Sequence, residues 1–313
     1  MSKTSIEWTD CSWNCVRGCS RVSEGCRNCY AERMAARFET AMFKPSKARP
    51  FGAGPFAGFT KGGKWTGRVE LIPSKLDEPL HWRKPRRVFV NSMSDLFHEA
   101  LSDEAIDQVF AVMALADQHT FQVLTKRPAR MLAYISSRPR DRIYPQMVVL
   151  ASEQVPGGLT RQREDWPLSN VWLGVSVEDQ ATADERIPLL LQTPAAVRFC
   201  SYEPALGPVD FSPYWLGGAC WACGAYKAQC ECGETAKLRR LDWLIVGGES
   251  GPGARPFDIA WARSAIAQCR EAGVPVFMKQ VGARPVGIPW PMTGKGGDPI
   301  QWPLDIQVRE FPK

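Results

Sequence analysis

Three cysteine residues near the start of the chain have the type and spacing best suited to chemistry. They are Cys19, Cys26 and Cys29, in the pattern C-x6-C-x2-C, and a helix is predicted directly after them, over residues 30–42. Three thiolates can hold a [4Fe–4S] cluster and leave one iron open, whereas a cluster with four thiolates usually only carries electrons. The usual ligand of an open iron is S-adenosylmethionine, and the chemistry is then radical. The spacing therefore predicts a catalytic iron–sulfur site.

Other interpretations of these cysteines are a zinc knuckle or three incidental buried thiols. Zinc prefers four ligands in C-x2–4-C pairs, which this pattern matches less well. Cys11 and Cys15 leave two rival ligand sets open, Cys11, Cys15 and Cys19, or Cys15, Cys19 and Cys26. Gly18 and Gly25 favour Cys19, Cys26 and Cys29 as the ligands, because glycine lets a loop fold tightly around a cluster.

A second cysteine group lies within residues 213–240, in the pattern C-x2-C-x6-C-x1-C. It consists of Cys220, Cys223, Cys230 and Cys232. Four close thiolates can surround a zinc ion and leave no open position, which is typical of a structural site. The alternative is an auxiliary iron–sulfur cluster. We expect a small zinc-binding insertion here.

Composition indicates an ordinary globular protein, since 44% of the 313 residues are hydrophobic and 23% are charged. No apolar run is long enough to span a bilayer, and the first residues do not resemble a signal peptide. We therefore expect a cytoplasmic protein, in the host cell if a phage encodes it. In a reducing compartment, eleven cysteines indicate metal ligation rather than disulfides. Local basic clusters, such as 84–87 and 126–130, favour a nucleic-acid partner, although each could be a solvated face.

Short apolar runs rich in valine, phenylalanine and tryptophan predict buried strands. They lie at 6–13, 87–90, 120–124, 170–175, 196–200, 241–246 and 274–278. Ser102 is predicted to cap a helix over 103–116, and Asp258 and Gly273 to bound another over 259–272. A helix that starts at Asp179 or Thr182 is expected to be interrupted or kinked by Pro188.

Alternating strands and helices predict an α/β fold with parallel strands. We expect a partial or full (β/α) barrel that forms a single domain over 1–313, with residues 213–240 as a cysteine-rich insertion. A doubly wound open sheet is the competing architecture. In a barrel, the polar residues after each strand converge on one rim. Residues 45–67 are predicted to form a long loop of the kind that covers or lines a site.

Several motifs resemble a phage and prophage family of radical-SAM-like proteins, which is distantly similar to spore photoproduct lyase. They are Ser-Ile-Glu-Trp-Thr-Asp at 5–10, the cysteine region at 18–33, Asn-Ser-Met-Ser-Asp-Leu-Phe-His at 91–98, Leu-Thr-Lys-Arg-Pro at 124–128, Trp-Leu-Gly-Val-Ser-Val-Glu at 172–178 and Gly-Gly-Glu-Ser-Gly at 247–251. The resemblance covers nearly the whole chain. It implies a barrel of the radical-SAM type with Cys19, Cys26 and Cys29 as cluster ligands. The chain departs from the general C-x3-C-x2-C pattern, since its first gap is six residues.

The residues that follow the predicted strands are candidates for binding and catalysis. Those expected to hold S-adenosylmethionine are Asn91, Ser92, Ser94, Asp95, Lys126 or Arg127, Ser176, Glu178 and Glu203. Lys126 or Arg127 could pair with the methionine carboxylate, Ser176 and Glu178 could bind the ribose, and Glu203 could bind the amino group. Glu249, Lys279 and Gln280 are the catalytic candidates, with Arg255 also facing substrate. For any one of them the alternative is a strand-end cap or a salt bridge.

Together these features predict a radical SAM enzyme that abstracts hydrogen from a nucleic-acid-linked substrate. The leading hypothesis is an isomerase that remodels an amino-acid-modified thymine in phage DNA, which requires the base to be flipped out. The substrate would be DNA or a modified nucleotide, and flavodoxin or ferredoxin would supply electrons. The alternatives are a lyase that repairs a thymine lesion and a non-catalytic, zinc-dependent DNA-binding accessory protein.

Overall fold

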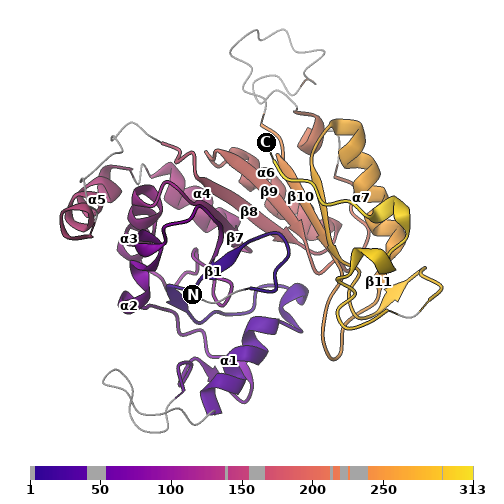
Figure 1. Cartoon of the computed structure of the whole chain (residues 1–313), viewed down its shortest axis with the longest axis horizontal. Helices are drawn as coiled ribbons and strands as arrows, with labels where there is room; N and C mark the ends of the chain where they lie inside the picture. Colours follow the sequence, from indigo (N-terminus) through magenta and orange to yellow (C-terminus); the bar gives the residue numbers. More distant parts are fainter. Residues whose placement is uncertain are drawn as a thin grey trace. The chain divides into compact units, whose positions relative to one another are not determined.

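The computed structural model describes residues 4–40, 54–137, 140–154, 166–211, 214–218, 225, 239–290 and 292–312. The chain divides into two compact units, Met1–Trp172 and Leu173–Lys313. Each unit alternates strands and helices (Figure 1). The prediction of a single domain stays a prediction.

The first unit contributes three short parallel strands to the main sheet. β1 (Cys11–Trp13) pairs with β6 (Arg87–Val90), which pairs with β7 (Thr120–Thr125). Trp13, Val88 and Phe121 in these strands are fully buried, as expected of strands covered on both faces. The carboxyl ends of these strands therefore lie at one edge of the sheet.

Helices of the first unit cover the strands and pack on one another. They are α2 (Pro73–Leu76), α3 (Asp103–Leu115), α4 (Pro128–Ser136) and α5 (Arg140–Gln154). The Ser102 hydroxyl caps α3 by accepting from the Ala105 N–H at 3.3 Å, which confirms the predicted start of this helix. α3 and α5 lie side by side (Figure 1). Arg142 of α5 and Tyr134 of α4 both bind the buried Asp107 of α3.

A smaller layer follows the cysteine loop in the same unit. It consists of α1 (Tyr30–Thr40) and the antiparallel hairpin of β3 (Thr60–Lys61) and β4 (Lys64–Trp65). The antiparallel strands β2 (Val16–Arg17) and β5 (Glu70–Leu71) flank it. The hairpin lies inside the segment predicted as a long loop, so that prediction is wrong for residues 60–65. Its turn is Gly62-Gly63, and both glycines have positive φ, as a tight hairpin turn requires.

The second unit repeats the strand–helix alternation. Its strands are β8 (Val171–Val177), which begins just before the unit boundary, β9 (Val197–Tyr202), β10 (Trp243–Gly247), β11 (Phe257–Asp258), β12 (Val276–Gln280) and β13 (Pro285–Val286). Its helices are α6 (Gln180–Gln192) and α7 (Ile259–Ala272). Asp258 caps the start of α7, and Gly273 ends it with a φ of 65°. Both predicted boundaries of α7 are confirmed.

In the part of the chain that the structure describes, seven strands form one sheet in the order β1-β6-β7-β8-β9-β10-β12. The pairs β1–β6, β6–β7, β9–β10 and β10–β12 within it are parallel. Because the order in space follows the order along the chain, the sheet is compatible with a partial (β/α) barrel. A doubly wound sheet reverses its strand order, so that alternative is excluded for these strands.

Of the two outcomes predicted for Pro188, interruption of the helix is wrong, and a kink stays a prediction. α6 continues through Pro188 to Gln192, although proline removes one backbone donor. Ile187, Leu190 and Leu191 are buried on both sides of the proline, and their packing outweighs the missing hydrogen bond.

Two predictions fall outside what the structure can test. The end of the helix predicted over 30–42 and the cysteine-rich group Cys220, Cys223, Cys230 and Cys232 lie outside the described residues. In the described part of the chain, no helix is long and apolar enough to cross a bilayer.

Candidate functional site

The cysteine loop is fastened to the carboxyl end of β6. Gly18 forms a parallel bridge with Ser94, four residues beyond the end of that strand. Gly18 has a φ of +90°, and a Cβ atom there would lie 1.9 Å from the carbonyl oxygen of Arg68. Only glycine fits both the backbone conformation and the space. The residue before Cys19 therefore fixes where the loop begins.

Cys26 and Cys29 lie at the entry to α1. Cys26 ends a short 3-10 turn over Glu24–Cys26, and its carbonyl accepts from the Cys29 N–H at 3.3 Å. The Cys29 carbonyl accepts from the Arg33 N–H at 3.2 Å, which places Cys29 at the amino end of α1. Burial raises the pKa of the Cys29 thiol, while the backbone N–H groups of Glu32 and Ala31 act against this. Such N–H groups also stabilise a thiolate that is bound to a metal.

Cys19 is half-buried at the other end of the loop. Burial raises the pKa of its thiol to about 12; the carboxylate of Asp95 adds to this, the Arg127 guanidinium opposes it, and Cys29 and Cys26 also raise it. The three thiols are thus close enough to influence one another electrostatically.

The donor set fits an iron–sulfur cluster in its chemistry. It offers three thiols on one short loop, one of them at a helix amino end and one beside a guanidinium. Within the described residues, however, no group of three or more His, Cys, Asp or Glu side chains is already placed to hold a metal ion. A cluster would therefore have to draw the three sulfurs together.

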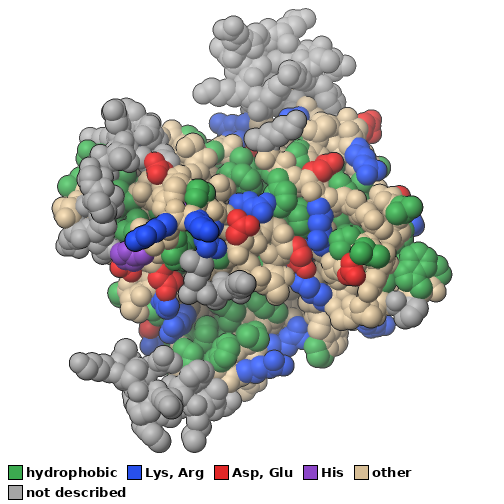
Figure 2. Space-filling model, in the orientation of Figure 1, with side chains coloured by type: hydrophobic (Ala, Val, Ile, Leu, Met, Phe, Trp, Pro, Cys, Tyr) green, Lys and Arg blue, Asp and Glu red, His purple; other side chains and the backbone are tan. Residues whose placement is uncertain are grey.

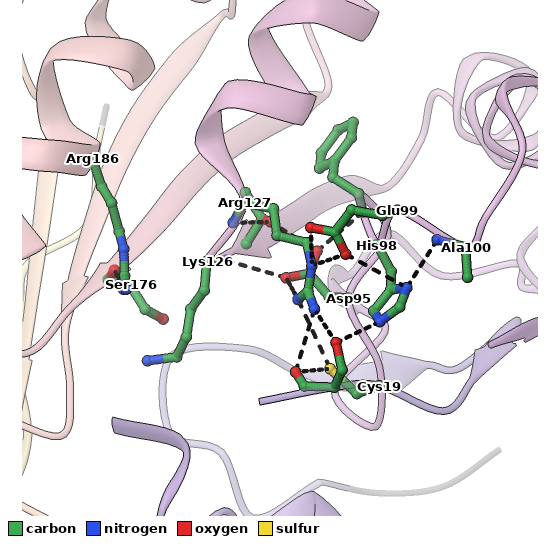
Figure 3. A network of polar contacts seen from close by, with 12 residues as sticks. Cys19, Asp95, His98, Glu99, Ala100, Lys126, Arg127, Ser176 and Arg186 are labelled. Carbon is green, nitrogen blue, oxygen red and sulfur yellow. Dashed lines mark hydrogen bonds and ion pairs between the residues drawn. The ribbon is translucent and has the colours of Figure 1, made fainter. Parts of the chain in front are cut away.

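Arg127 lies at the centre of a polar network behind Cys19 (Figure 3). Its side chain is 4% exposed. Its Nε donates to both carboxylate oxygens of Glu99, at 2.9 and 2.8 Å. Its Nη1 donates to Asp95 at 3.1 Å and lies 4.0 Å from the Cys19 sulfur. Its Nη2 donates to the Ser20 hydroxyl at 2.7 Å and to the Ser20 carbonyl at 3.3 Å. The guanidinium thereby holds both Cys19 and the residue after it.

Ser20 and His98 resemble a nucleophile and its base, but their hydrogen bonds exclude this role. The Ser20 Oγ and the His98 Nε2 are 2.8 Å apart. The His98 Nδ1 accepts from the Ala100 N–H at 3.1 Å, so the proton of the neutral ring is on Nε2. His98 therefore donates to Ser20 and cannot take its proton. Burial and the neighbouring Arg127 lower the pKa of His98, which favours this neutral form.

The residues predicted after the second strand are brought together with the cysteine loop. Asp95 accepts from the Thr125 hydroxyl at 2.7 Å and from the Lys126 N–H at 3.2 Å, in addition to Arg127. The Ser94 hydroxyl donates to the Val16 carbonyl at 3.0 Å. These contacts give Asp95 and Ser94 a structural role at the edge that carries the cysteines.

Asn91 and Ser92 hold the segment that leads into the loop. Asn91 has a φ of 61°, and its Oδ1 accepts from the Val16 N–H at 3.1 Å. The Ser92 hydroxyl donates to the Asn14 Oδ1 at 3.2 Å. Asparagine is one of the few residues that adopt a left-handed conformation readily, which explains its position here.

A buried carboxylate joins the loop to the smaller layer. Glu32 of α1 is 2% exposed and accepts from the Arg21 Nε at 3.1 Å and from the Trp65 N–H at 2.9 Å. Arg21 belongs to the cysteine loop and Trp65 to β4. Glu32 therefore ties the loop, α1 and the hairpin together.

In the second unit, a separate polar cluster lies at the carboxyl ends of β9, β10 and β12. The Lys279 Nζ donates to both oxygens of Glu203 at 2.7 Å, and the Gln280 Nε2 donates to Glu203 at 3.1 Å. Gln280 also donates to the Gly248 carbonyl at 2.9 Å. The structure thus brings three of the predicted site residues into direct contact. A Cβ at Gly248 would lie 2.6 Å from the Val281 carbonyl, so the strand ends are closely packed there.

The other candidates of the second unit form ion pairs. Glu249 accepts from the Arg255 Nη2 at 2.6 Å and from its backbone N–H at 2.9 Å. Glu178 is 1% exposed and pairs with the buried Arg186 at 3.1 Å, and the Ser176 carbonyl accepts from the same guanidinium at 2.8 Å. Arg186 was missed from the sequence, because its place in the middle of a helix gives no signal that it reaches a strand end.

These features define an α/β protein whose parallel strands carry a thiol-bearing loop at their carboxyl edge. The family model described as "Protein of unknown function (DUF5131)" matches residues 3–293. The chain therefore belongs to the DUF5131 family. No curated protein and no solved structure matches it.

Proposed function

We propose that this protein is a radical SAM enzyme whose [4Fe–4S] cluster is held by Cys19, Cys26 and Cys29. The observation that carries the proposal is the bridge between Gly18 and Ser94, because it fastens the thiol-bearing loop to the carboxyl end of a parallel strand. Barrel enzymes have their active sites at that edge. The three-thiol set also leaves one iron without a protein ligand.

When bound, such a cluster supplies an electron for the reductive cleavage of S-adenosylmethionine to methionine and a radical that abstracts hydrogen. Flavodoxin or ferredoxin is the proposed source of that electron. The protein's own residues position the loop. Arg127 donates to the Ser20 carbonyl next to Cys19, Asp95 holds the Arg127 guanidinium in place, and the Arg127 charge favours electron-rich sulfur.

The proposed substrate is linked to a nucleic acid. Basic segments of the chain support this, since cationic side chains neutralise phosphates. Within that class, rearrangement of an amino-acid-modified thymine base in DNA is the finer proposal. In the second unit, Glu203, Lys279 and Gln280 form a compact polar group at strand ends, which suits them to substrate binding.

Anaerobic reconstitution of the full chain with iron and sulfide tests the proposal. We expect a brown protein with about four irons per chain, which forms 5′-deoxyadenosine when given S-adenosylmethionine and a reductant. Cys19→Ala, Cys26→Ala and Cys29→Ala should each lose iron and product. Cys11→Ala is the matched control, because Cys11 is buried in β1, and it should retain both.

A colourless protein that holds only zinc would overturn the proposal and favour the non-catalytic accessory protein. Loss of iron in Cys11→Ala with retention in Cys26→Ala and Cys29→Ala would instead assign the cluster to Cys11, Cys15 and Cys19.

A further inference from the structure

Helix α1 displays an unusual combination of residues on one face. Tyr30, Arg33, Met34 and Arg37 are spaced i, i+3, i+4 and i+7, so they form one stripe along the helix. Tyr30 is 47% exposed and Met34 is 36% exposed. The opposite side carries the buried residues Ala31, Glu32 and Ala35. We call the stripe the α1 face; it interleaves apolar and cationic side chains in solvent.

The α1 face is mounted on a rigid support. Ala35, Phe56 and Phe59 form a buried cluster, against which Phe38 and Trp65 pack. Glu32 adds its hydrogen bond to the Trp65 N–H. Because α1 is held to the hairpin by both apolar and polar contacts, the face is presented without a large ordering cost on binding.

Three cations of this layer are not paired with an acid in the part of the chain that the structure describes. Lys61, Lys64 and Arg37 are exposed and have no ion-pair partner among the described residues. The acidic side chains of the layer are already engaged: Glu32 with Arg21, Glu70 with Arg68, and Glu39 with the Thr60 hydroxyl. The layer is therefore an attractive surface for an anionic partner.

On the face of the molecule shown in Figure 2, basic side chains are interspersed with acidic and apolar ones and form no continuous block. A partner bound by charge alone would favour a broad basic area. A row that alternates an aromatic ring, an apolar side chain and single cations suits a single-stranded nucleic acid, because both its bases and its phosphates are exposed.

The α1 face leads directly to the cysteine loop. Tyr30 follows Cys29 in the chain, and its hydroxyl donates to the Ser92 carbonyl at 2.6 Å, which fixes the ring at the carboxyl edge of β6. Val22 of the same loop is 43% exposed. The cysteine loop therefore also exposes an apolar side chain.

We propose that the α1 face is a track for single-stranded DNA, in which a base stacks on Tyr30 and phosphates contact Arg33 and Arg37. Lys61 and Lys64 on the hairpin add long-range attraction. The track explains how an unpaired base is delivered to the thiol-bearing loop, so its purpose rests on the proposed function. The binding of single-stranded DNA to the track does not rest on the proposed function, because stacking and phosphate contacts need no cluster.

Fluorescence anisotropy with a labelled thymidine oligonucleotide of about 20 residues tests the track over a salt series of about 50 to 300 mM. The double variant Arg33→Gln/Arg37→Gln should bind about tenfold more weakly. Its slope of log affinity against log salt should fall by about 1.4, since each phosphate contact on a single strand contributes about 0.7. Tyr30→Ala should weaken binding at least about fivefold without changing the slope, and Tyr30→Phe, which keeps the ring but loses the hydrogen bond to Ser92, should bind more tightly than Tyr30→Ala.

Arg263→Gln/Arg270→Gln is the matched control. Both residues are exposed and lie seven residues apart on α7, in the second unit and away from the α1 face in the chain. This variant should change affinity less than twofold, and circular dichroism should show that all variants are folded. Equal weakening in the control, an unchanged slope in the Arg33/Arg37 variant, or wild-type binding by Tyr30→Ala would each overturn the track.

Failure of the track and failure of the proposed function are distinguishable, because binding is measured on the full chain before and after cluster loading. Absent 5′-deoxyadenosine with normal track behaviour contradicts the radical chemistry alone. Normal 5′-deoxyadenosine formation with no effect of the α1 face variants contradicts the track alone. Tighter binding of an acidic protein than of the oligonucleotide at this face would also overturn it.

Discussion

Arg127 shows how one residue can serve both the fold and the site. Burial alone would lower the pKa of its guanidinium, but Asp95 and Glu99 reverse this and raise it. Its N–H groups contact two carboxylates, a hydroxyl, a carbonyl and a thiol. Because the side chain is almost fully enclosed, a neutral replacement would leave Asp95 buried beside Cys19 without its counter-charge.

Arg127→Met is expected to lower the free energy of unfolding by about 3 kcal/mol, because it removes one partner of a buried ion pair. Urea denaturation measures the change. Arg127→Met/Asp95→Asn should be destabilised by less than the sum of the two single variants, since the two residues are coupled. Strict additivity would show that the pair contributes no interaction energy.

His119 gives the stability of the protein a predictable pH dependence. Its Nε2 lies 3.2 Å from the Pro79 carbonyl, and its buried Nδ1 has no hydrogen-bond partner among the described residues. Burial and the charge of Arg86 lower the pKa of His119. In the unfolded chain the pKa of His119 has its ordinary value of about 6.5. Stability is therefore fully present above that pH and falls as the pH drops from it towards the lower folded pKa.

His119→Gln should make the fall of Tm between about pH 7 and pH 5 shallower, because the variant removes one group that protonates only on unfolding. Thermal melts monitored by circular dichroism measure this. Above about pH 8, where the ring is neutral in both the folded and the unfolded state, the Tm values of the two proteins should change with pH in parallel. An equally steep fall of Tm in both proteins below about pH 7 would show that His119 does not cause this pH dependence.

At the scale of elements, the position of the cysteine loop depends on Gly18. Gly18→Ala should be destabilised by several times the 1–2 kcal/mol that a left-handed alanine typically costs, because its Cβ would also collide with the Arg68 carbonyl. Gly62→Ala is the matched control, since Gly62 has a φ of +58° and no atom lies within 4 Å of its added Cβ.

The two glycine variants should also differ in iron content. Gly18→Ala should lose the reconstituted cluster, whereas Gly62→Ala should retain it, because only the first displaces Cys19. Urea denaturation and iron analysis of both variants test this. Similar losses in the two variants would show that conformational strain alone, and not the close contact with Arg68, governs this loop.

The strands were predictable because burial on both faces leaves a continuous apolar run, such as Val171–Val177. The hairpin at Thr60–Lys61 and Lys64–Trp65 was not, because its strands are two residues long and largely exposed. At the site, sequence position placed Asp95 and Glu178 at strand ends correctly. Their partners Arg127 and Arg186 could not be paired with them, because the spacing of residues gives no information about which side chains meet across elements.

At the scale of the whole molecule, each compact unit carries its own polar group at the ends of parallel strands. The Cys19–Arg127–Asp95 network belongs to the first unit, and the Glu203–Lys279–Gln280 group to the second. That these groups act together on one substrate stays a prediction.

The cysteines of the molecule divide into buried thiols and two groups suited to metals. Cys11, Cys15, Cys200 and Cys269 are buried. Cys200 lies in β9 and Cys269 in α7, and neither belongs to a set of three or four closely spaced cysteines of the kind that holds a cluster or a zinc ion. The metal-binding capacity of the chain should therefore reside in the cysteine loop and in the group from Cys220 to Cys232.

Metal analysis of the whole chain tests this division. Cys19→Ala/Cys26→Ala/Cys29→Ala should lose iron and retain one zinc, because the two groups ligate independently. Cys220→Ser/Cys223→Ser should lose zinc and retain about four irons, and Cys200→Ala/Cys269→Ala should retain both metals. Iron that persists in the triple variant would place the cluster at the second group. The cysteine loop would then have no open iron, and the thiol edge of the sheet would be structural.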